Sequence, residues 1–174
     1  MSAGDRRIPE GLVLIKDLIN TLDVESGRDT LAAFAEERGL PVPGLVPGLV
    51  TLREALREAC VAHTGPDMRP ERGAQLAALL RSAPLTVTVD ATGRASLTPA
   101  PGLSPAAEFT ARVAAAIATA EAGGTWQRLK ACGAESCRWA YYDHSPAGRR
   151  RWCSMQVCGS RAKMRAYRAK QRGE

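Results

Sequence analysis

Four cysteines near the C-terminus, arranged as two pairs of equal spacing, constrain this chain more than any other feature. The pairs are Cys132-x4-Cys137 and Cys153-x4-Cys158. Each pair can lie on one tight turn, and the residues between the pairs are numerous enough for a hairpin that brings them together. Four thiolates fill the tetrahedral coordination of one Zn²⁺ ion. The spacing therefore predicts one structural zinc ion, with no open position for water or substrate.

Other roles for these thiols are less consistent with the sequence. Two disulfides need an oxidising compartment, which nothing in the sequence indicates. Four unrelated buried thiols would not fall into matched pairs. Cys60 and His63 are also capable of metal binding, but they lie on the inner face of a predicted helix, which favours a buried thiol and a hydrogen-bonded imidazole. His144 lies between the cysteine pairs and is a competing ligand, although four cysteines suffice.

Charge divides the 174-residue chain into two parts. Residues 1–123 hold 12 basic and 15 acidic residues, whereas residues 124–174 hold 12 basic and 3 acidic residues. All three tryptophans lie in the second part. The contrast predicts two domains, 1–123 and 124–174, joined near the glycines at 123 and 124. Because the chain has no apolar run of about 18 residues, and residues 1–10 lack the apolar stretch of a signal peptide, we expect no membrane segment and a cytoplasmic, nucleoid-associated protein.

Residue patterns predict that the first domain is mostly helical. Helical spacing covers residues 11–22, 30–38, 51–63, 69–82 and 104–121, although LVLI at 12–15 also suits a strand. Prolines at 41, 43 and 47 are expected to exclude regular structure there, and Thr51 and Ser104 to cap the helices that follow. Alternation over residues 85–98, around a turn at 90–93, predicts a β-hairpin. The predicted fold class is α+β: a helical module with a hairpin, then a small four-cysteine zinc finger with a C-terminal basic helix.

The residues after Cys158 are predicted to form that basic helix. The segment is rich in strong helix formers, with Ser160 as its N-cap and with Met164 and Tyr167 facing back toward the zinc. Arginines recur every three or four residues, which places them on one stripe. A solubilising tail is the alternative, but solvated faces normally mix both signs of charge. The predicted contacts to nucleic-acid phosphates are Arg149, Arg150, Arg151, Arg161, Lys163, Arg165, Arg168, Lys170 and Arg172.

The segment from Cys132 to Arg168 strongly resembles the CGNR zinc finger. The matching features are the first cysteine pair, an aromatic-rich strand leading to Asp143 and Ser145, GRRRWCSM at 148–155, and Cys158-Gly-x-Arg161-Ala-Lys163. In addition, LIKDLINTLD at 14–23 and LREALRE at 52–58 resemble the ABATE domain that usually precedes this finger. Ser160 replaces the asparagine of the family's name motif. Serine preserves a helix cap, but specificity would differ if the asparagine contacts a base.

The resemblance implies a role in gene regulation. Members of this family are bacterial and are regarded as stress-induced transcription regulators. The first domain would then be a sensor or dimerisation domain that holds a small-molecule effector. Asp17, Asn20 and Thr21 lie in its family-like motif, where Asp17 and Asn20 can either bind a ligand or brace the hairpin.

Taken together, these patterns favour a zinc-dependent regulator that binds duplex DNA, acting as a homodimer because one short helix reads few base pairs. An RNA-binding module is the first alternative, with Trp139, Tyr141 and Tyr142 stacking on bases, although packing within the zinc hairpin also explains these aromatics. A protein-interaction module stabilised by zinc is the second. We expect no enzyme, because the sequence has no glycine-rich phosphate loop and no Ser-His-Asp set.

Overall fold

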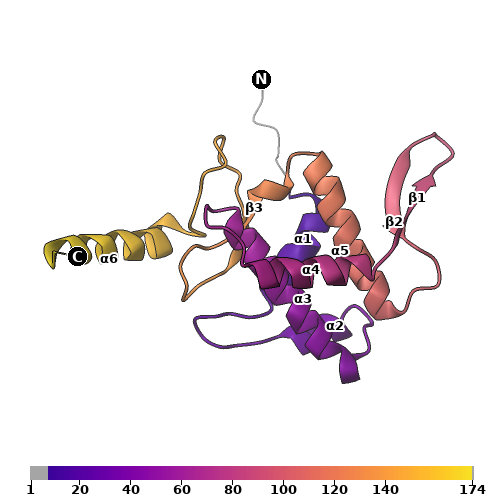
Figure 1. Ribbon diagram of the computed structural model, residues 1–174, viewed down its shortest axis with the longest axis horizontal. Coiled ribbons are helices and arrows are strands. Elements are labelled where there is room, and N and C mark those ends of the chain that lie inside the picture. The colour runs from indigo at the N-terminus through magenta and orange to yellow at the C-terminus, as the bar shows by residue number, and fades with distance from the viewer. Residues whose placement is uncertain (1–7, 174) are drawn as a thin grey trace.

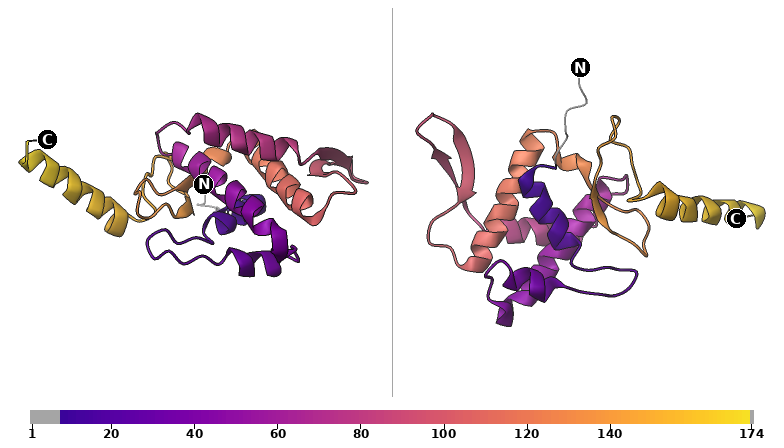
Figure 2. Two further views of the ribbon diagram at one scale, coloured as in Figure 1. Left: turned by 60° about the horizontal axis from the view of Figure 1, so that its bottom comes forward. Right: turned by 180° about the vertical axis from the view of Figure 1, so that it is seen from behind.

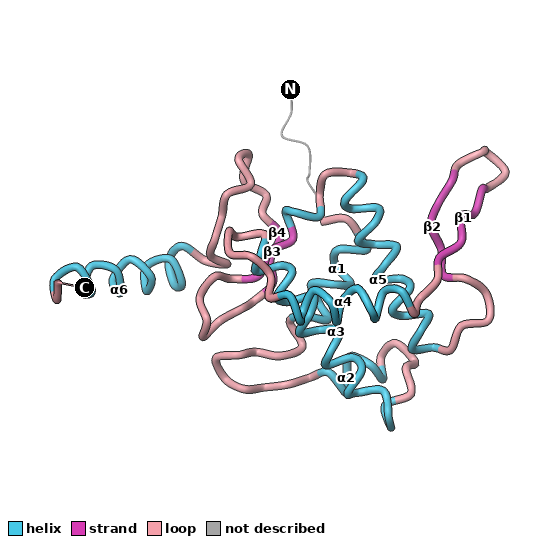
Figure 3. Tube along the Cα trace, in the orientation of Figure 1, coloured by secondary structure: helices cyan, strands magenta, loops and turns pink. Residues whose placement is uncertain are grey.

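A computed structural model describes residues 8–173, and for residues 42–46 it describes the backbone alone. Within this range the chain forms six α-helices and two antiparallel hairpins, which confirms the α+β class (Figures 1 and 3). Residues 1–7, most of the segment expected to lack a signal peptide, lie outside the described residues. The helices are α1 (Glu10–Ile19), α2 (Leu31–Glu36), α3 (Val42–Ala62), α4 (Pro70–Arg81), α5 (Pro105–Ala122) and α6 (Ser160–Gln171). The strands are β1 (Leu85–Val89), β2 (Ala95–Pro99), β3 (Leu129–Ala131) and β4 (Ala140–Tyr142).

Helices α1 to α5 form the body of the molecule. Residues 12–15 are helical rather than extended, because the apolar residues of α1 recur on one face that the core buries completely. Helix α1 packs closely against α5, since a Cβ added at Gly11 would lie 2.6 Å from the Cβ of Ala116. Ser104 accepts a hydrogen bond from the Ala107 N–H and so caps α5, as predicted.

The proline-rich segment at 41–48 contradicts its prediction, because most of it is helical. Helix α3 begins at Val42 and includes Pro47. Pro43 lies in the first turn, where a proline costs no hydrogen bond because the N–H groups there have no partner within the helix. Pro47 lies inside the helix and cannot donate the backbone hydrogen bond that another residue would make there. Thr51 is therefore an interior residue and not a cap, and its hydroxyl donates to the Pro47 carbonyl at 2.9 Å. Downstream, α3 buries Leu52, Leu56 and Cys60, as its apolar spacing predicts.

Hairpin β1–β2 forms as predicted and projects from the body (Figure 1). The register pairs Val87 with Leu97, and Thr88 with Ser96. Alternation therefore gives the hairpin one apolar and one hydroxyl-bearing face. Most of the hairpin is exposed, and Val87 and Val89 each keep 64% of their surface accessible, whereas its base packs on α5 through β2.

Hairpin β3–β4 connects the body to the cysteine-bearing segment. Strand β3 packs on α3, and β4 packs on α1. Trp126, Leu129 and Tyr142 belong to the same hydrophobic core as the helices. We call residues 132–159, which follow from β3 and carry the four cysteines, the knuckle. The division at residues 123 and 124 stays a prediction, and the core extends across it.

His63, at the end of α3, provides a second link to β3. Its Nδ1 donates to the Leu129 carbonyl at 2.7 Å, and its ring packs edge-on against Trp126. Cys60, one turn earlier, is fully buried in the core. This confirms the interpretation of the two residues as a buried thiol and a hydrogen-bonded imidazole.

Lowering the pH is expected to destabilise the protein through His63. Burial lowers the pKa of this imidazole below its usual 6.5, so the folded state keeps it neutral while the unfolded state takes up a proton. The stabilisation is complete above pH 6.5 and is lost as the pH falls. Urea unfolding at pH 7.5 and 5.5 measures the change in unfolding free energy, with His63→Gln as the non-titrating control. The wild type should lose more stability than the variant, and an equal loss would exclude His63 as the cause.

Candidate metal centre

The four predicted cysteine ligands meet at one point. Their Sγ atoms all lie within 4.8 Å of one another. The Sγ atom of Cys153 lies 3.6 Å from that of Cys137 and 3.8 Å from that of Cys158. A tetrahedral ion with Zn–S bonds of about 2.3 Å separates its sulfurs by about 3.8 Å. The geometry therefore fits one zinc ion and confirms the predicted ligand set.

Backbone hydrogen bonds fix the loops that carry these ligands. Cys132 directly follows β3, and its N–H donates to the Trp139 carbonyl at 2.9 Å. The next N–H, of Gly133, donates to the Arg151 carbonyl at 2.9 Å and so ties the first cysteine loop to the segment before Cys153. A Cβ at Gly133 would lie 3.2 Å from the Trp152 ring, so this close approach favours glycine. The two cysteine pairs are thus held together by more than the metal.

The local environment disfavours free thiolates at two of the ligands. Burial, reinforced by the neighbouring sulfurs, raises the pKa of Cys158 to about 11 and that of Cys153 further. At Cys132 burial acts in the same direction, but hydrogen bonds from the backbone and from neighbouring thiols outweigh it and lower the pKa. Zinc binding must therefore displace protons from the cluster. Four sulfur ligands leave no coordination position for a substrate, so the site is structural.

A buried ion pair supports the second cysteine loop, and no sequence pattern pointed to it. Lys130 and Asp143 lie 3.0 Å apart with side chains 3% and 0% exposed. Asp143 also accepts hydrogen bonds from Ser145 and from the Arg150 N–H. Burial opposes ionisation of Asp143, but these bonds outweigh it and hold the carboxyl pKa well below its usual 3.8. The pair therefore fixes the chain path from β4 to the arginine-rich loop.

Helix α6 continues directly from the last zinc ligand. Residues Met155–Gly159 form a π-helical turn that contains Cys158 and runs into α6. Ser154 caps this turn by accepting from the Val157 N–H. The prediction of Ser160 as N-cap is wrong, because the helical backbone already begins five residues earlier. Its hydroxyl instead donates to the Met155 carbonyl at 3.1 Å.

Helix α6 extends away from the body and buries none of its residues (Figures 1 and 2). The prediction that Met164 and Tyr167 face the zinc site is wrong, since they are 51% and 59% exposed. Nothing in the described part of the body reaches far enough along the helix to cover them. The residues from Ser160 to Gln171 include no acid, so α6 is a basic rod.

The predicted phosphate contacts fall into different environments. Arg150 is committed within the knuckle, where its guanidinium donates to the Cys153 carbonyl at 2.8 Å and lies over the Tyr141 ring. Arg161 is exposed but forms an ion pair with Glu25 at 2.8 Å. The other seven are all exposed: Arg149 and Arg151 in the loop, and Lys163, Arg165, Arg168, Lys170 and Arg172 on or just after α6.

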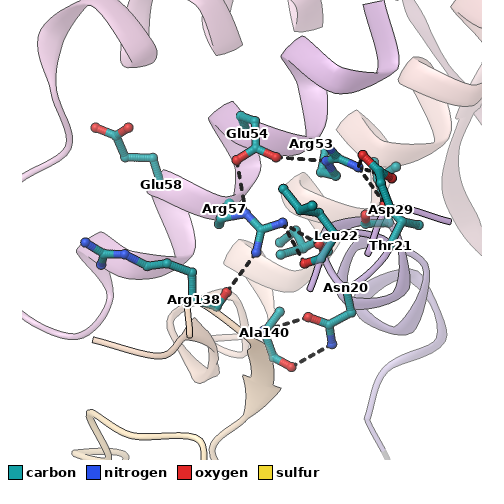
Figure 4. Close-up of polar contacts among 12 residues, drawn as sticks. Asn20, Thr21, Leu22, Asp29, Arg53, Glu54, Arg57, Glu58, Arg138 and Ala140 are labelled. Carbon is teal, nitrogen blue, oxygen red and sulfur yellow. Dashed lines mark hydrogen bonds and ion pairs between the residues drawn. The ribbon is translucent and has the colours of Figure 1, made fainter. Parts of the chain in front are cut away.

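The Asn20 side chain joins the body to the knuckle (Figure 4). Its Nδ2 donates to the Ala140 carbonyl at 2.9 Å, and its Oδ1 accepts from the Ala140 N–H at 2.7 Å. Thr21 accepts from Arg53 at 3.0 Å, within the body. Asp17 pairs with the neighbouring Lys16 at 2.9 Å. The three motif residues therefore do not converge on one site, and Asn20 braces the hairpin that carries Cys132.

Two buried arginines of α3 lie near this junction, and Arg57 contacts the knuckle directly (Figure 4). Arg57 donates to the Ile19 carbonyl at 2.7 Å and to the Arg138 carbonyl of the knuckle at 3.0 Å. Arg53 forms an ion pair with Asp29 at 2.8 Å. Neither interaction was predicted. Apolar spacing identifies the buried face of α3, but it cannot reveal a polar partner 81 residues away.

Comparison with known proteins finds a family similarity in the knuckle and its helix. Residues 128–171 match the CGNR zinc finger family model. The match includes β3, all four cysteines and the whole of α6. No match to a curated protein is found. The resemblance of the first domain to ABATE stays a prediction. In the described part of the chain, no helix is both long and apolar enough to cross a membrane.

Proposed function

We propose that this chain is a zinc-dependent regulator of transcription that binds duplex DNA through α6. The observation that carries the proposal is a helix free of acidic residues that projects from a four-cysteine centre into solvent. An α-helix of 12 residues is about 18 Å long, and the major groove of B-DNA accommodates such a helix. The zinc centre fixes its orientation, because Cys158 and α6 share one run of helical backbone.

Six exposed cations lie on α6 and on the arginine-rich loop before Cys153, and none of them forms an ion pair with a carboxylate of the described residues. Because each cation that meets a phosphate releases counterions, their number sets the salt dependence of binding. Arg150 and Arg161 contribute less to this salt dependence, since each already has a partner within the chain. The six cations are Arg149, Arg151, Lys163, Arg165, Arg168 and Lys170.

Binding to DNA is expected to weaken steeply with salt. Six phosphate contacts predict a slope of roughly −5 for log K against log salt concentration. Replacing Arg165 and Arg168 together by glutamine should reduce the slope by about 2 and weaken binding to all duplexes. Fluorescence anisotropy with zinc-loaded protein and labelled duplexes between about 50 and about 300 mM salt measures both quantities.

The matched control removes the same charge elsewhere. Arg81 of α4 and Arg94 of hairpin β1–β2 are exposed arginines outside the knuckle and α6, and their double glutamine variant should bind DNA like the wild type. A flat salt dependence, or equal weakening by both double variants, would contradict a role for α6. Sequencing of the duplexes retained from sheared genomic DNA then tests specificity, since a regulator should enrich a few sites.

The proposed regulator acts by binding and not by catalysis. Its helical body would hold a small-molecule effector and form a homodimer, and a stress signal would act through that body. Such a protein would work in the cytoplasm, at the nucleoid. A second chain would supply a second α6 and so extend the short sequence that one helix can read.

Duplex DNA is favoured over RNA by the burial of two aromatic residues. Tyr141 and Tyr142 are each 9% exposed, and the Tyr141 hydroxyl donates to the Arg150 carbonyl. Only Trp139 of the three proposed stacking residues is substantially exposed, at 40%. Single-strand recognition usually combines several stacked aromatics with base contacts. Competition of labelled duplex DNA with single-stranded RNA separates the two substrates.

Exposed apolar residues support protein interaction as a second function of this region. Met155, Val157, Met164 and Tyr167 are each about half exposed along the π-helical turn and α6. Apolar clusters with basic neighbours suit a groove on an acidic partner protein. Under this alternative, replacing Met164 and Tyr167 would abolish partner binding, whereas replacing Arg165 and Arg168 would affect it less.

A further inference from the structure

A groove lies where the body meets the knuckle. Its volume is about 760 Å³, which falls within the ~300–1,000 Å³ typical of small-molecule sites. Leu22, Glu54 and Glu58 line it from the body, and Gly133, Arg138 and Arg151 line it from the knuckle. We call this feature the junction groove. A ligand bound there would contact both parts of the molecule at once.

The carboxylates on the α3 side of the junction groove are already neutralised. Glu54 accepts from Arg53 at 2.8 Å and from Arg57 at 3.1 Å. Glu58 accepts from the Arg69 guanidinium at 2.6 Å and from the Arg69 N–H at 2.9 Å. The remaining lining acids, Asp67 and Glu135, are exposed to solvent. The groove therefore offers no concentrated negative charge for a cation.

Two arginines of the knuckle, in contrast, reach the junction groove without a carboxylate partner. Within the described residues, neither Arg138 nor Arg151 forms an ion pair with an acidic side chain. Arg138 is half-buried and has a left-handed backbone, with φ of 52°. The hydrogen bond from Arg57 to its carbonyl fixes that backbone. Figure 4 shows its guanidinium extending away from Ala140, on the side of α3 from which Glu58 projects.

A half-buried guanidinium without a carboxylate partner is a strong donor for a carboxylate or phosphate, because such bonds are charge-assisted and can be bidentate. Arg138 is half-buried, whereas Asp67 and Glu135 of the groove are exposed. Leu22, Val24 and Val61 add an apolar surface to the same groove. This combination of a few fixed polar groups with an apolar wall is typical of small-molecule sites.

We propose that the junction groove binds an anionic small molecule, with its carboxylate or phosphate held by Arg138 and Arg151 and its apolar part packed on Leu22, Val24 and Val61. The proposal supplies an effector site for the regulator proposed above. Because the ligand would bridge the body and the knuckle, it would strengthen the junction that orients α6. The test measures anion binding directly and uses no DNA. The anion site can therefore be disproved while DNA binding holds, and DNA binding can be disproved while the anion site holds.

The test is a titration of the zinc-loaded, ¹⁵N-labelled full chain with citrate and, separately, with inorganic phosphate. Sodium chloride keeps the ionic strength constant. Saturable shifts are expected at the amides of Gly133, Arg138 and Arg151, with much smaller shifts in hairpin β1–β2. Tighter binding of citrate would identify carboxylates as the preferred group, and tighter binding of phosphate would identify phosphate esters.

Arg138→Asn is the decisive variant, because asparagine tolerates the left-handed backbone and preserves the fold. Loss of a charge-assisted bond should weaken anion binding at least tenfold. Arg94→Gln, at the turn of hairpin β1–β2, removes one exposed arginine outside the groove and should leave the affinity unchanged. Equal affinity in Arg138→Asn, shifts confined to α6, or the absence of saturation with both anions would overturn the proposal.

Discussion

The Cys153→Ser protein is expected to lose its zinc and, with it, the ordered knuckle. Binding of structural zinc contributes an apparent ~10–16 kcal/mol to the folding of small zinc modules, and serine is a poor replacement for one of four thiolates. Residues 132–159 bury few apolar side chains of their own. The body should stay folded, since its helices form the main core together with Leu129 and Ala131, which precede the knuckle. Metal analysis and circular dichroism measure the two effects.

Cys60→Ala is the matched control for this experiment. Cys60 is the one cysteine outside the cluster, and it is buried in the core. Its replacement removes a thiol and should cost stability but no metal. Retention of one equivalent of zinc by Cys153→Ser would contradict the ligand assignment. Loss of zinc from Cys60→Ala would show that metal content follows general stability and not the four-sulfur site.

Asp143→Ala is expected to destabilise the protein by about 3–5 kcal/mol, because an uncompensated buried charge has a cost of this size. The substitution leaves the Lys130 ammonium buried without its counter-charge. It also removes the acceptor for the Ser145 and Arg150 N–H groups. Urea unfolding followed by the fluorescence of the three tryptophans measures the change in unfolding free energy.

Two further variants test the cause of this loss. Glu135→Ala removes an exposed acid of the same knuckle and should change stability by no more than about 0.5 kcal/mol. Adding Lys130→Met to Asp143→Ala removes the stranded charge and should restore part of the stability. If Asp143→Ala unfolds like the wild type, the ion pair does not support the knuckle. If the double variant is no more stable than Asp143→Ala, the lost backbone hydrogen bonds are the main cause.

The zinc site was predictable because its information is local. Spacing alone indicated that Cys132, Cys137, Cys153 and Cys158 share one ion, and the hairpin at 85–98 followed from alternation and a turn. The prediction for the proline-rich segment was wrong, because Pro41 and Pro43 fall at the start of α3, where proline costs little, and the helix then continues through Pro47. The prediction of Ser160 as a helix cap was wrong because the π-helical turn before it cannot be recognised from propensities.

Long-range polar contacts were the part that the sequence did not predict. Nothing near Asn20 indicates that it pairs with the backbone of Ala140, 120 residues away. Arginine and lysine usually lie on the surface, but three of them are buried here, each with partners from distant segments: Arg53, Arg57 and Lys130. Apolar periodicity reports which face of an element is buried. It does not report which polar groups cross between elements.

The direction of helix α6 is fixed relative to the zinc ligand Cys158. A glycine linker in an extended conformation would let a basic helix sample many directions, but Gly159 itself has helical backbone angles, with φ of −64°. Cys158 and the first turn of α6 therefore form one rigid unit. Redirecting the helix requires either unwinding that turn or detaching a sulfur from the metal. Helix α6 therefore already has a fixed direction before a partner binds. Binding then costs little conformational entropy for orienting the helix.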